Sequence, residues 1–200
     1  TGLNTGGMGT FSPQTKYTPD MAERAMKTVF LPTVRALEKE GRPFKGVLYF
    51  GLMITSAGDI KVLEYNARFG DPETQVILPR LKTDLFDVFN ACIDGTLNKT
   101  ALKWDERAAV CVVAASGGYP LKYEKGKKIT FGDLDSDVTV YHAGTAICSD
   151  CGEIVTNGGR VLGVTALGKD LSEAKKKAYD NIKKISFEGM FYRSDICKEA

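Results

Sequence analysis

The sequence predicts an α+β protein that ends in a small β-rich domain with one helix. Apolar residues recur at helical spacing between residues 19 and 41. Two apolar segments within residues 45–66 flank a turn and predict a β-hairpin. From about Trp104 the pattern changes to short strand-like segments separated by turn residues. We therefore predict two domains, residues 1–104 and residues 105–200.

The first domain begins with a predicted loop and a helix. Residues 1–16 are rich in glycine, whose backbone freedom disfavours regular structure. Thr18 and Pro19 are typical of a helix start, as the cap and the first helical residue. Pro32 should kink or split this helix, because proline donates no backbone hydrogen bond. Gly41 should end it in a left-handed conformation.

A hairpin and further helix complete the first domain. Residues 45–55 and 60–66 are the predicted antiparallel strands. Residues 74–95 are predicted to be mostly helical, with Asp84 as a cap inside that range. In the second domain, strands are predicted at residues 107–115, 127–131, 138–147, 152–156 and 160–167. Residues 170–173 resemble a capping box, in which Asp170 and Glu173 open a helix that runs to about Ile185.

The composition is that of an ordinary globular protein. The chain has 200 residues, of which 43% are hydrophobic and 26% charged, so it can bury a core without disulfides. A formal net charge of +2 argues against a nucleic-acid partner or a membrane surface. Five irregularly spaced cysteines and the lack of a signal peptide predict a reduced, cytoplasmic protein. The first residue is not Met and lies in a glycine-rich loop, which predicts a fragment of a longer chain.

Three polar residues at the end of the hairpin could carry chemistry. Glu64 and Asn66 are two residues apart on a strand, so their side chains point to the same face. A carboxylate and an amide oxygen on one face can hold a hard cation such as Mg²⁺. Arg68 would share that face if the strand continued, and its guanidinium could bind phosphate oxygens. A solvated sheet face is the commoner explanation of such spacing, and it stays open.

Four motifs resemble those of one enzyme family. Residues 64–75, EYNARFGDPETQ, resemble the signature of the phosphoribosylamine–glycine ligases, also called glycinamide ribonucleotide synthetases, of the ATP-grasp superfamily. The other segments are similar to further motifs of that family and occur in its order: residues 4–9, residues 141–145 with 157–162, and residues 191–196. Four ordered motifs along the whole chain are more specific than any single glycine-rich loop.

The resemblance implies an ATP-dependent carboxylate–amine ligase of purine synthesis. Such enzymes join glycine to 5-phosphoribosylamine and form glycinamide ribonucleotide. The glycine carboxylate attacks the γ-phosphate of ATP to give glycyl phosphate, and the amine of phosphoribosylamine then displaces phosphate. The resemblance also implies that the chain holds the C-terminal half of an ATP-grasp domain, followed by the β-rich domain.

Carried onto this sequence, the resemblance assigns roles to particular residues. Glu64 and Asn66 would bind Mg²⁺ or Mn²⁺ together with ATP, which is the co-substrate. Arg68 would be the catalytic residue, because it would steady the transferring phosphoryl group. The other candidates would shape the pocket for the acceptor substrates: Thr5, Gly6, Gly7, Gly9, Gly70, Asp71, Pro72 and Glu73.

The same resemblance predicts that this chain alone is inactive. The N-terminal domain and the nucleotide-clamping half of such enzymes lie upstream of the residues present here. The chain would therefore need that N-terminal half as a partner. Two alternatives stay open: a different ATP-grasp carboxylate–amine ligase, or a non-catalytic fragment that binds a partner chain.

Two further signals are predicted to be structural. Cys148 and Cys151 form a CxxC motif, but a zinc site needs a second pair of ligands, so a hairpin turn without zinc is expected. His142 is the only histidine, and its apolar neighbours Val140 and Ala143 predict a packed structural residue rather than a catalytic base.

Overall fold

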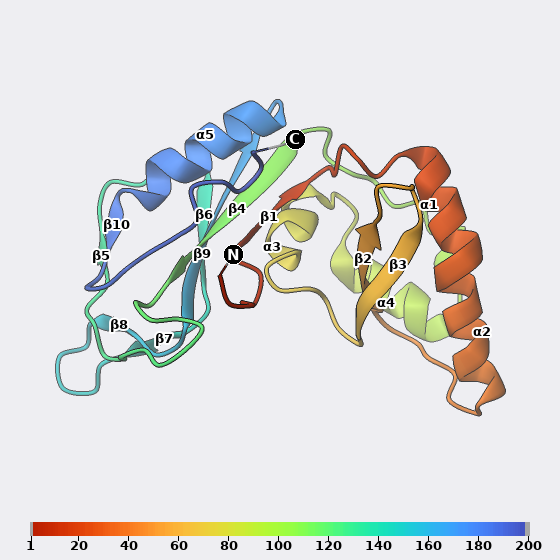
Figure 1. Ribbon diagram of the computed structural model, residues 1–200, viewed down its shortest axis with the longest axis horizontal. Helices are drawn as coiled ribbons and strands as arrows, with labels where there is room; N and C mark the ends of the chain where they lie inside the picture. Colours follow the sequence, from red (N-terminus) through yellow and green to blue (C-terminus); the bar gives the residue numbers. More distant parts are fainter. Residues whose placement is uncertain (1, 199–200) are drawn as a thin grey trace. The chain divides into compact units, whose positions relative to one another are not determined.

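The computed structural model describes residues 2–198, which form two compact units (Figure 1). The sheet unit consists of Thr1–Pro13, Asp71–Lys82 and Trp104–Ala200, and the hairpin unit of Gln14–Gly70 and Thr83–Lys103. The compact units thus combine segments from both sides of Trp104. The predicted domain limits, residues 1–104 and 105–200, stay a prediction.

The hairpin unit begins with a helix that changes its hydrogen-bonding pattern before Pro32. Its three parts are α1 (Pro19–Ala25), a π-helical turn η1 (Met26–Phe30) and α2 (Leu31–Lys39). Proline cannot donate a backbone hydrogen bond, and a π-helical turn accommodates the missing bond. Thr18 caps the start by accepting a hydrogen bond from the Met21 amide at 3.3 Å, and Gly41 has φ +71°. The predicted helix, its cap and its interruption are confirmed.

The predicted hairpin is also confirmed. Strands β2 (Tyr49–Ile54) and β3 (Ile60–Asn66) pair in antiparallel orientation. Helix α4 (Leu85–Asp94) follows in the same unit; Asp84 caps it by accepting from the Phe86 amide at 2.8 Å, and Gly95 ends it at φ +70°. The first part of the predicted helical range 74–95 forms α3 (Thr74–Ile77) and a 3₁₀ turn (Leu78–Arg80), both in the sheet unit.

The sheet unit is built on a four-stranded antiparallel sheet. Its strands, in spatial order, are β1 (Gly9–Ser12), β4 (Ala108–Ala115), β9 (Arg160–Gly168) and β6 (Val138–His142). β1 corrects the prediction of a loop over residues 1–16. Gly9 pairs with Val112 and Ser12 with Ala109, so distant strand pairing outweighs the weak local preference of a glycine-rich segment.

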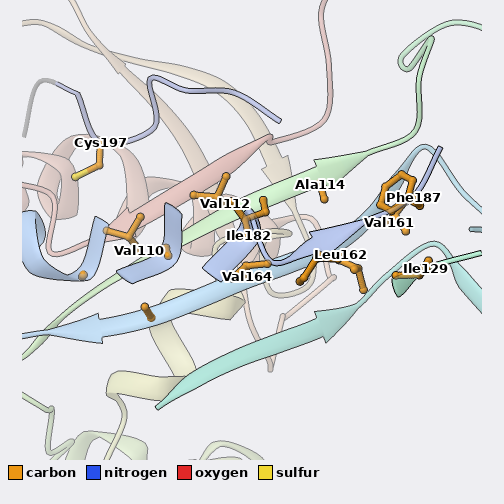
Figure 2. Close-up of a cluster of buried hydrophobic side chains, with 14 of the residues drawn as sticks. Val110, Val112, Ala114, Ile129, Val161, Leu162, Val164, Ile182, Phe187 and Cys197 are labelled. Carbon is orange, nitrogen blue, oxygen red and sulfur yellow. The ribbon is translucent and has the colours of Figure 1, made fainter. Parts of the chain in front are cut away.

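Helix α5 (Leu171–Ile182) covers one face of this sheet, and the main core lies beneath it (Figure 2). Val110, Val112 and Ala114 of β4 belong to this core. The intervening residues Ala109 and Cys111 pack with Val76 of α3 in a second cluster. Because both faces of β4 are covered, the strand is buried along its whole length.

The start of α5 is stabilised as predicted. The Asp170 carboxylate accepts a hydrogen bond from the Glu173 amide at 2.8 Å. Glu173 in turn accepts from the Lys169 amide at 2.8 Å, so two backbone donors at the helix start have partners. The helix ends at Ile182 rather than near residue 185, where β10 (Ile185–Ser186) pairs with β5 (Thr130–Phe131).

A short hairpin corrects two predictions. The strand predicted over residues 138–147 is divided into β6 and β7 (Thr145–Ile147), and β7 pairs with β8 (Ile154–Thr156). The turn between β7 and β8 contains Cys148 and Cys151, which are joined as a disulfide. The expectation that all cysteines are reduced is therefore wrong for this pair; Cys92, Cys111 and Cys197 are free thiols.

An arginine explains why residues from both sides of Trp104 belong to the sheet unit. Arg80 donates hydrogen bonds to the Ser12 hydroxyl at 2.5 Å, the Arg107 carbonyl at 2.7 Å and the Asp105 carbonyl at 3.2 Å. The Arg107 guanidinium, with a smaller contribution from Lys82, holds the pKa of the Asp105 carboxyl well below its usual range. The charge-assisted hydrogen bonds of Arg80 thus join the segment of Ser12, the segment of Arg80 itself and the segment of Asp105 and Arg107.

Candidate functional site

The candidate metal ligands lie on one face of the β2–β3 hairpin. Tyr49 pairs with Asn66, and Gly51, two residues further along β2, pairs with Glu64. Residues directly opposite each other on antiparallel strands share a face, so Glu64 and Asn66 lie on the same face. The other face is aromatic: the Phe50 ring lies 4.7 Å from that of Phe30 and 5.2 Å from that of Tyr65. The prediction that Glu64 and Asn66 share a face is confirmed.

Glu64 sits beside a register shift. Gly51 pairs with Glu64 whereas Leu52 pairs with Val62, so Leu63 is an extra residue in β3. Such bulges are common near functional sites, where they redirect side chains. A Cβ atom added to Gly51 would lie 2.8 Å from Glu64 Cγ and 3.6 Å from Glu64 Oε1. The Glu64 side chain therefore occupies the space that glycine leaves open.

The donor set of this face fits a hard divalent cation. Glu64 is exposed and Asn66 half-buried, so both can contribute oxygen atoms to a shared ligand. Mg²⁺ is usually held by one or two protein groups, with waters and substrate phosphates completing its octahedron. Within residues 2–198, no three His, Cys, Asp or Glu side chains gather into a closed metal site. A cation at this position would thus rely on a nucleotide for its remaining ligands.

Substituting Gly51 tests whether the Glu64 side chain must lie where it does. If Glu64 serves as a metal ligand in an enzyme that contains this chain, Gly51→Ala is expected to lower kcat/KM by roughly tenfold, because displacing a reacting or ligand group by about 1 Å can cost ~100-fold. The half-saturating Mg²⁺ concentration should rise in parallel. Steady-state kinetics across a Mg²⁺ titration would measure both effects.

Gly2→Ala is the matched control, because a Cβ atom at that glycine meets nothing within 4 Å. It should leave both quantities unchanged. A Gly51→Ala enzyme with the Mg²⁺ dependence of the parent would show that the close approach has no role in placing Glu64.

Arg68 lies just beyond the hairpin. β3 ends at Asn66 and the chain then bends, so strand alternation does not place Arg68 on the face of Glu64 as the sequence suggested. The side chain is exposed, and its Nη1 donates to the Phe69 carbonyl at 2.8 Å. This bond to a neighbouring carbonyl orients the guanidinium without neutralising its charge.

The candidate substrate loops fold against each other within the sheet unit. A Cβ atom on Gly7 would collide with the Pro72 ring, so Gly7 allows the loop of Thr5, Gly6 and Gly9 to approach Asp71. Pro72 is fully buried, so it can shape a pocket only through packing. Gly70 and Glu73 lie on either side of Asp71 and Pro72, and Gly70 belongs to the hairpin unit.

Sequence reasoning gave no role to Arg160 or Tyr119, although each lies in or beside a glycine-rich motif. The Arg160 guanidinium reaches Gly7 and Asp71, and the Tyr119 hydroxyl accepts from the Gly6 amide at 2.9 Å. The signal that could have found Arg160 is its position directly after Gly158 and Gly159, where glycine leaves space for neighbouring side chains.

The residues considered as other catalytic groups have structural surroundings. His142 is exposed, its ring centroid lies 6.1 Å from that of Phe131, and its Nδ1 lies 3.1 Å from the Thr145 hydroxyl at the start of β7. Burial raises the pKa of the Cys111 thiol to about 12, so this cysteine is a poor nucleophile at neutral pH.

Among the described residues, no helix is both long and apolar enough to cross a membrane.

Two family profiles match the chain. "Phosphoribosylglycinamide synthetase, ATP-grasp (A) domain" matches residues 1–74, and "Phosphoribosylglycinamide synthetase, C domain" matches residues 109–199. The phosphoribosylamine–glycine ligase of Synechocystis sp. is 50% identical over 100% of this chain and 48% of its own length. That of Caldanaerobacter subterraneus is also 50% identical, over 98% and 46%. The chain thus spans about half the length of the relatives it matches.

Solved structures agree with these matches. The crystal structure of phosphoribosylamine–glycine ligase from Thermotoga maritima superposes with a TM-score of 0.84 and 39% identity, covering 98% of this chain and 48% of that one. The biotin carboxylase domain of Hydrogenobacter thermophilus 2-oxoglutarate carboxylase has a TM-score of 0.64 at 12% identity, covering 92% and 40%. The second likeness shows the α+β ATP-grasp fold alone. The chain belongs to the phosphoribosylglycinamide synthetase family, with segments that match its ATP-grasp (A) and C domains.

Proposed function

We propose that this chain is the C-terminal half of an ATP-dependent ligase that joins glycine to 5-phosphoribosylamine in the cytoplasm. The observation that carries the proposal is the polar face of the β2–β3 hairpin, where Glu64 and Asn66 lie together just before Arg68. An oxygen pair for a cation followed by an arginine suits phosphoryl transfer, which depends on positioning and charge stabilisation. Family membership supports glycine and phosphoribosylamine as the molecules joined.

The proposed reaction uses the residues of this chain in two steps. Glu64 and Asn66 would hold Mg²⁺ or Mn²⁺, which when bound neutralises charge on the ATP phosphates. Arg68 would bind the γ-phosphoryl group while a glycine carboxylate oxygen attacks its phosphorus and ADP leaves. The amine of phosphoribosylamine then attacks the glycyl carbonyl carbon, phosphate leaves, and the amide nitrogen loses a proton.

The acceptor pocket is proposed to be shaped by two loops. The loop of Thr5, Gly6, Gly7 and Gly9 and the segment from Gly70 to Glu73 would shape the acceptor pocket. Backbone amides of a glycine-rich loop can approach an anionic group closely, because no Cβ atom intervenes. The adenine and triphosphate clamps would come from the N-terminal half of the enzyme.

Mixing this chain with the N-terminal half of the enzyme tests the proposal. The isolated chain is expected to bind Mg-ATP weakly and to form no glycinamide ribonucleotide, because Glu64 and Asn66 offer too few ligands to hold the ion tightly. Calorimetry measures the first property, and a product assay with and without the N-terminal half measures the second.

Each outcome of this experiment distinguishes a different alternative. Activity that appears only in the mixture, and only with both glycine and phosphoribosylamine, supports the proposal. Activity with another carboxylate or amine would indicate a different ATP-grasp ligase. Inactivity of the mixture, under conditions where the intact enzyme is active, would favour a non-catalytic partner-binding role. Micromolar affinity of the isolated chain for Mg-ATP would contradict the assignment of the nucleotide clamp to the missing half.

A further inference from the structure

We propose that Arg160, supported by Tyr119, is a positioning residue that holds the two substrate loops of the sheet unit in register. This inference rests on the proposed function, because those loops are assigned there to the acceptor pocket. Arg160 would act through the loops and would not itself touch a reacting atom.

The Arg160 guanidinium bonds to both loops at once. Its Nη1 donates to the Gly7 carbonyl at 3.1 Å and to the Asp71 carbonyl at 2.8 Å. Its Nη2 donates to Asp71 Oδ2 at 2.8 Å. The Arg160 side chain is only 23% exposed and that of Asp71 is 48% exposed, so removing Arg160 would take away the one donor group that three acceptors share. The geometry of a planar guanidinium suits this task, since one rigid group serves acceptors from two segments.

Asp71 is tied into the protein through both of its carboxylate oxygens. Besides the Arg160 contact, its Oδ1 accepts a hydrogen bond from Gln75 Nε2 at 3.1 Å. Both carboxylate oxygens therefore have protein donors. Asp71 orients the loop through these bonds, and the loop presents its neighbouring backbone to the acceptor pocket.

Tyr119 fixes the glycine loop from a second direction. Its hydroxyl accepts from the Gly6 amide at 2.9 Å, and a Cβ atom on Gly6 would lie 3.0 Å from that oxygen and 3.1 Å from Arg160 Cζ. A Cβ atom on Gly159 would collide with the Tyr119 ring. We call Arg160 and Tyr119 together the clamp. At Gly6 and at Gly159, a side chain of the clamp lies directly against the backbone, because no Cβ atom intervenes.

The clamp is anchored in the core of the sheet. Arg160 is the first residue of β9 and pairs with Ala115 at the end of β4. The Ser116 hydroxyl donates to the Gly158 carbonyl at 2.8 Å, and the Ser116 amide donates to the Gly159 carbonyl at 2.8 Å. These bonds hold the backbone that carries Arg160, so the guanidinium is placed by the most buried strands of the unit.

Hydrogen exchange in the full-length enzyme tests the positioning role directly. In Arg160→Gln, backbone amides of residues 5–9 are expected to exchange at least about tenfold faster, because the loop loses its charged hydrogen bonds. Tyr119→Phe should accelerate chiefly the Gly6 amide, since only that bond is removed. Mass spectrometry of short peptides, or NMR, would measure these rates.

Steady-state kinetics connects the loop to the reaction. Arg160→Gln should raise KM for glycine or phosphoribosylamine by about tenfold, while KM for ATP stays within about twofold, because the clamp orders only the acceptor loops. Arg160→Lys should recover part of the loss, since an ammonium can still reach one acceptor. Arg193→Gln is the matched control, because the Arg193 guanidinium in the same unit donates to Asp195, at 2.7 Å from its Nε, and not to Gly7 or Asp71.

The outcomes separate this proposal from the proposed function. Unchanged exchange rates in Arg160→Gln and Tyr119→Phe would overturn the positioning role. Faster exchange with unchanged KM values, or an equal rise of all three KM values, would show a structural tie without a role at the acceptor pocket and would also overturn it. If the parent enzyme does not form glycinamide ribonucleotide, the proposed function fails, whereas the exchange rates still decide whether the clamp exists. Should Arg160→Gln not fold, Arg160→Lys tests the Arg160 contacts and Tyr119→Phe the Gly6 contact, by the same exchange rates and KM values.

Discussion

Replacing Arg68 with alanine is expected to lower kcat of the proposed full-length ligase by about a hundredfold or more, the scale for losing one charge contact in the transition state. The structure supports this expectation because Arg68 is exposed and a hydrogen bond to the Phe69 carbonyl orients its guanidinium. A guanidinium held in this way remains available for phosphate oxygens. Its loss should slow phosphoryl transfer without disturbing the fold of the hairpin.

The measurement is single-turnover and steady-state kinetics on the variant and on Arg24→Ala. Arg24 is a matched control, because it also lies exposed in the hairpin unit and donates to a backbone carbonyl, that of Gly58 at 3.1 Å. Arg24→Ala should retain the kcat of the parent. If Arg68→Ala changed KM for ATP alone, the residue would bind the ground state rather than the transition state.

Replacing Glu64 with glutamine is expected to raise the half-saturating Mg²⁺ concentration by at least about tenfold, the lower end of the losses seen when even indirect metal contacts are removed. The amide keeps the size of the carboxylate and one oxygen donor, but it lacks the charge that a hard cation prefers. Because Gly51 leaves room for either side chain, the geometry of the hairpin should survive the change.

A Mg²⁺ titration of activity compares this variant with Glu23→Gln. Glu23 is an exposed carboxylate on α1 that pairs with Lys27 at 2.5 Å, far along the chain from the polar hairpin face. Glu23→Gln should titrate like the parent enzyme. Equal Mg²⁺ dependence of the parent and Glu64→Gln would remove Glu64 from the set of ligands.

Local features of the fold could be predicted from the sequence. The hairpin of residues 45–66, the interruption at Pro32 and the caps Asp84 and Asp170 were all predicted correctly. Each depends on interactions within a few residues, such as a side chain capping the next helical turn. Glu64 and Asn66 could be placed on one face for the same reason, since strand alternation is a local property.

Features that depend on distant segments could not be predicted. β1 forms because residues 9–12 pair with β4, about a hundred residues further along the chain. The register shift at Leu63 depends on how β2 pairs with β3. β3 ends at Asn66, so the strand alternation that would have placed Arg68 on the face of Glu64 does not reach Arg68. Cys148 and Cys151 are paired because the β7–β8 turn brings their Cα atoms to 5.5 Å.

The sequence by itself determined which residues could do chemistry and which family motifs they resemble, because a residue's functional groups and its spacing along a strand need no tertiary contact. Only the tertiary structure decided what holds those residues in place. Gly51 leaves space for Glu64 across a strand pair, and Arg160 joins Gly7 to Asp71 although it lies 153 and 89 residues from them along the chain. Such supports depend on side chains meeting backbone across long sequence separations, and spacing along a sequence carries no information about those meetings.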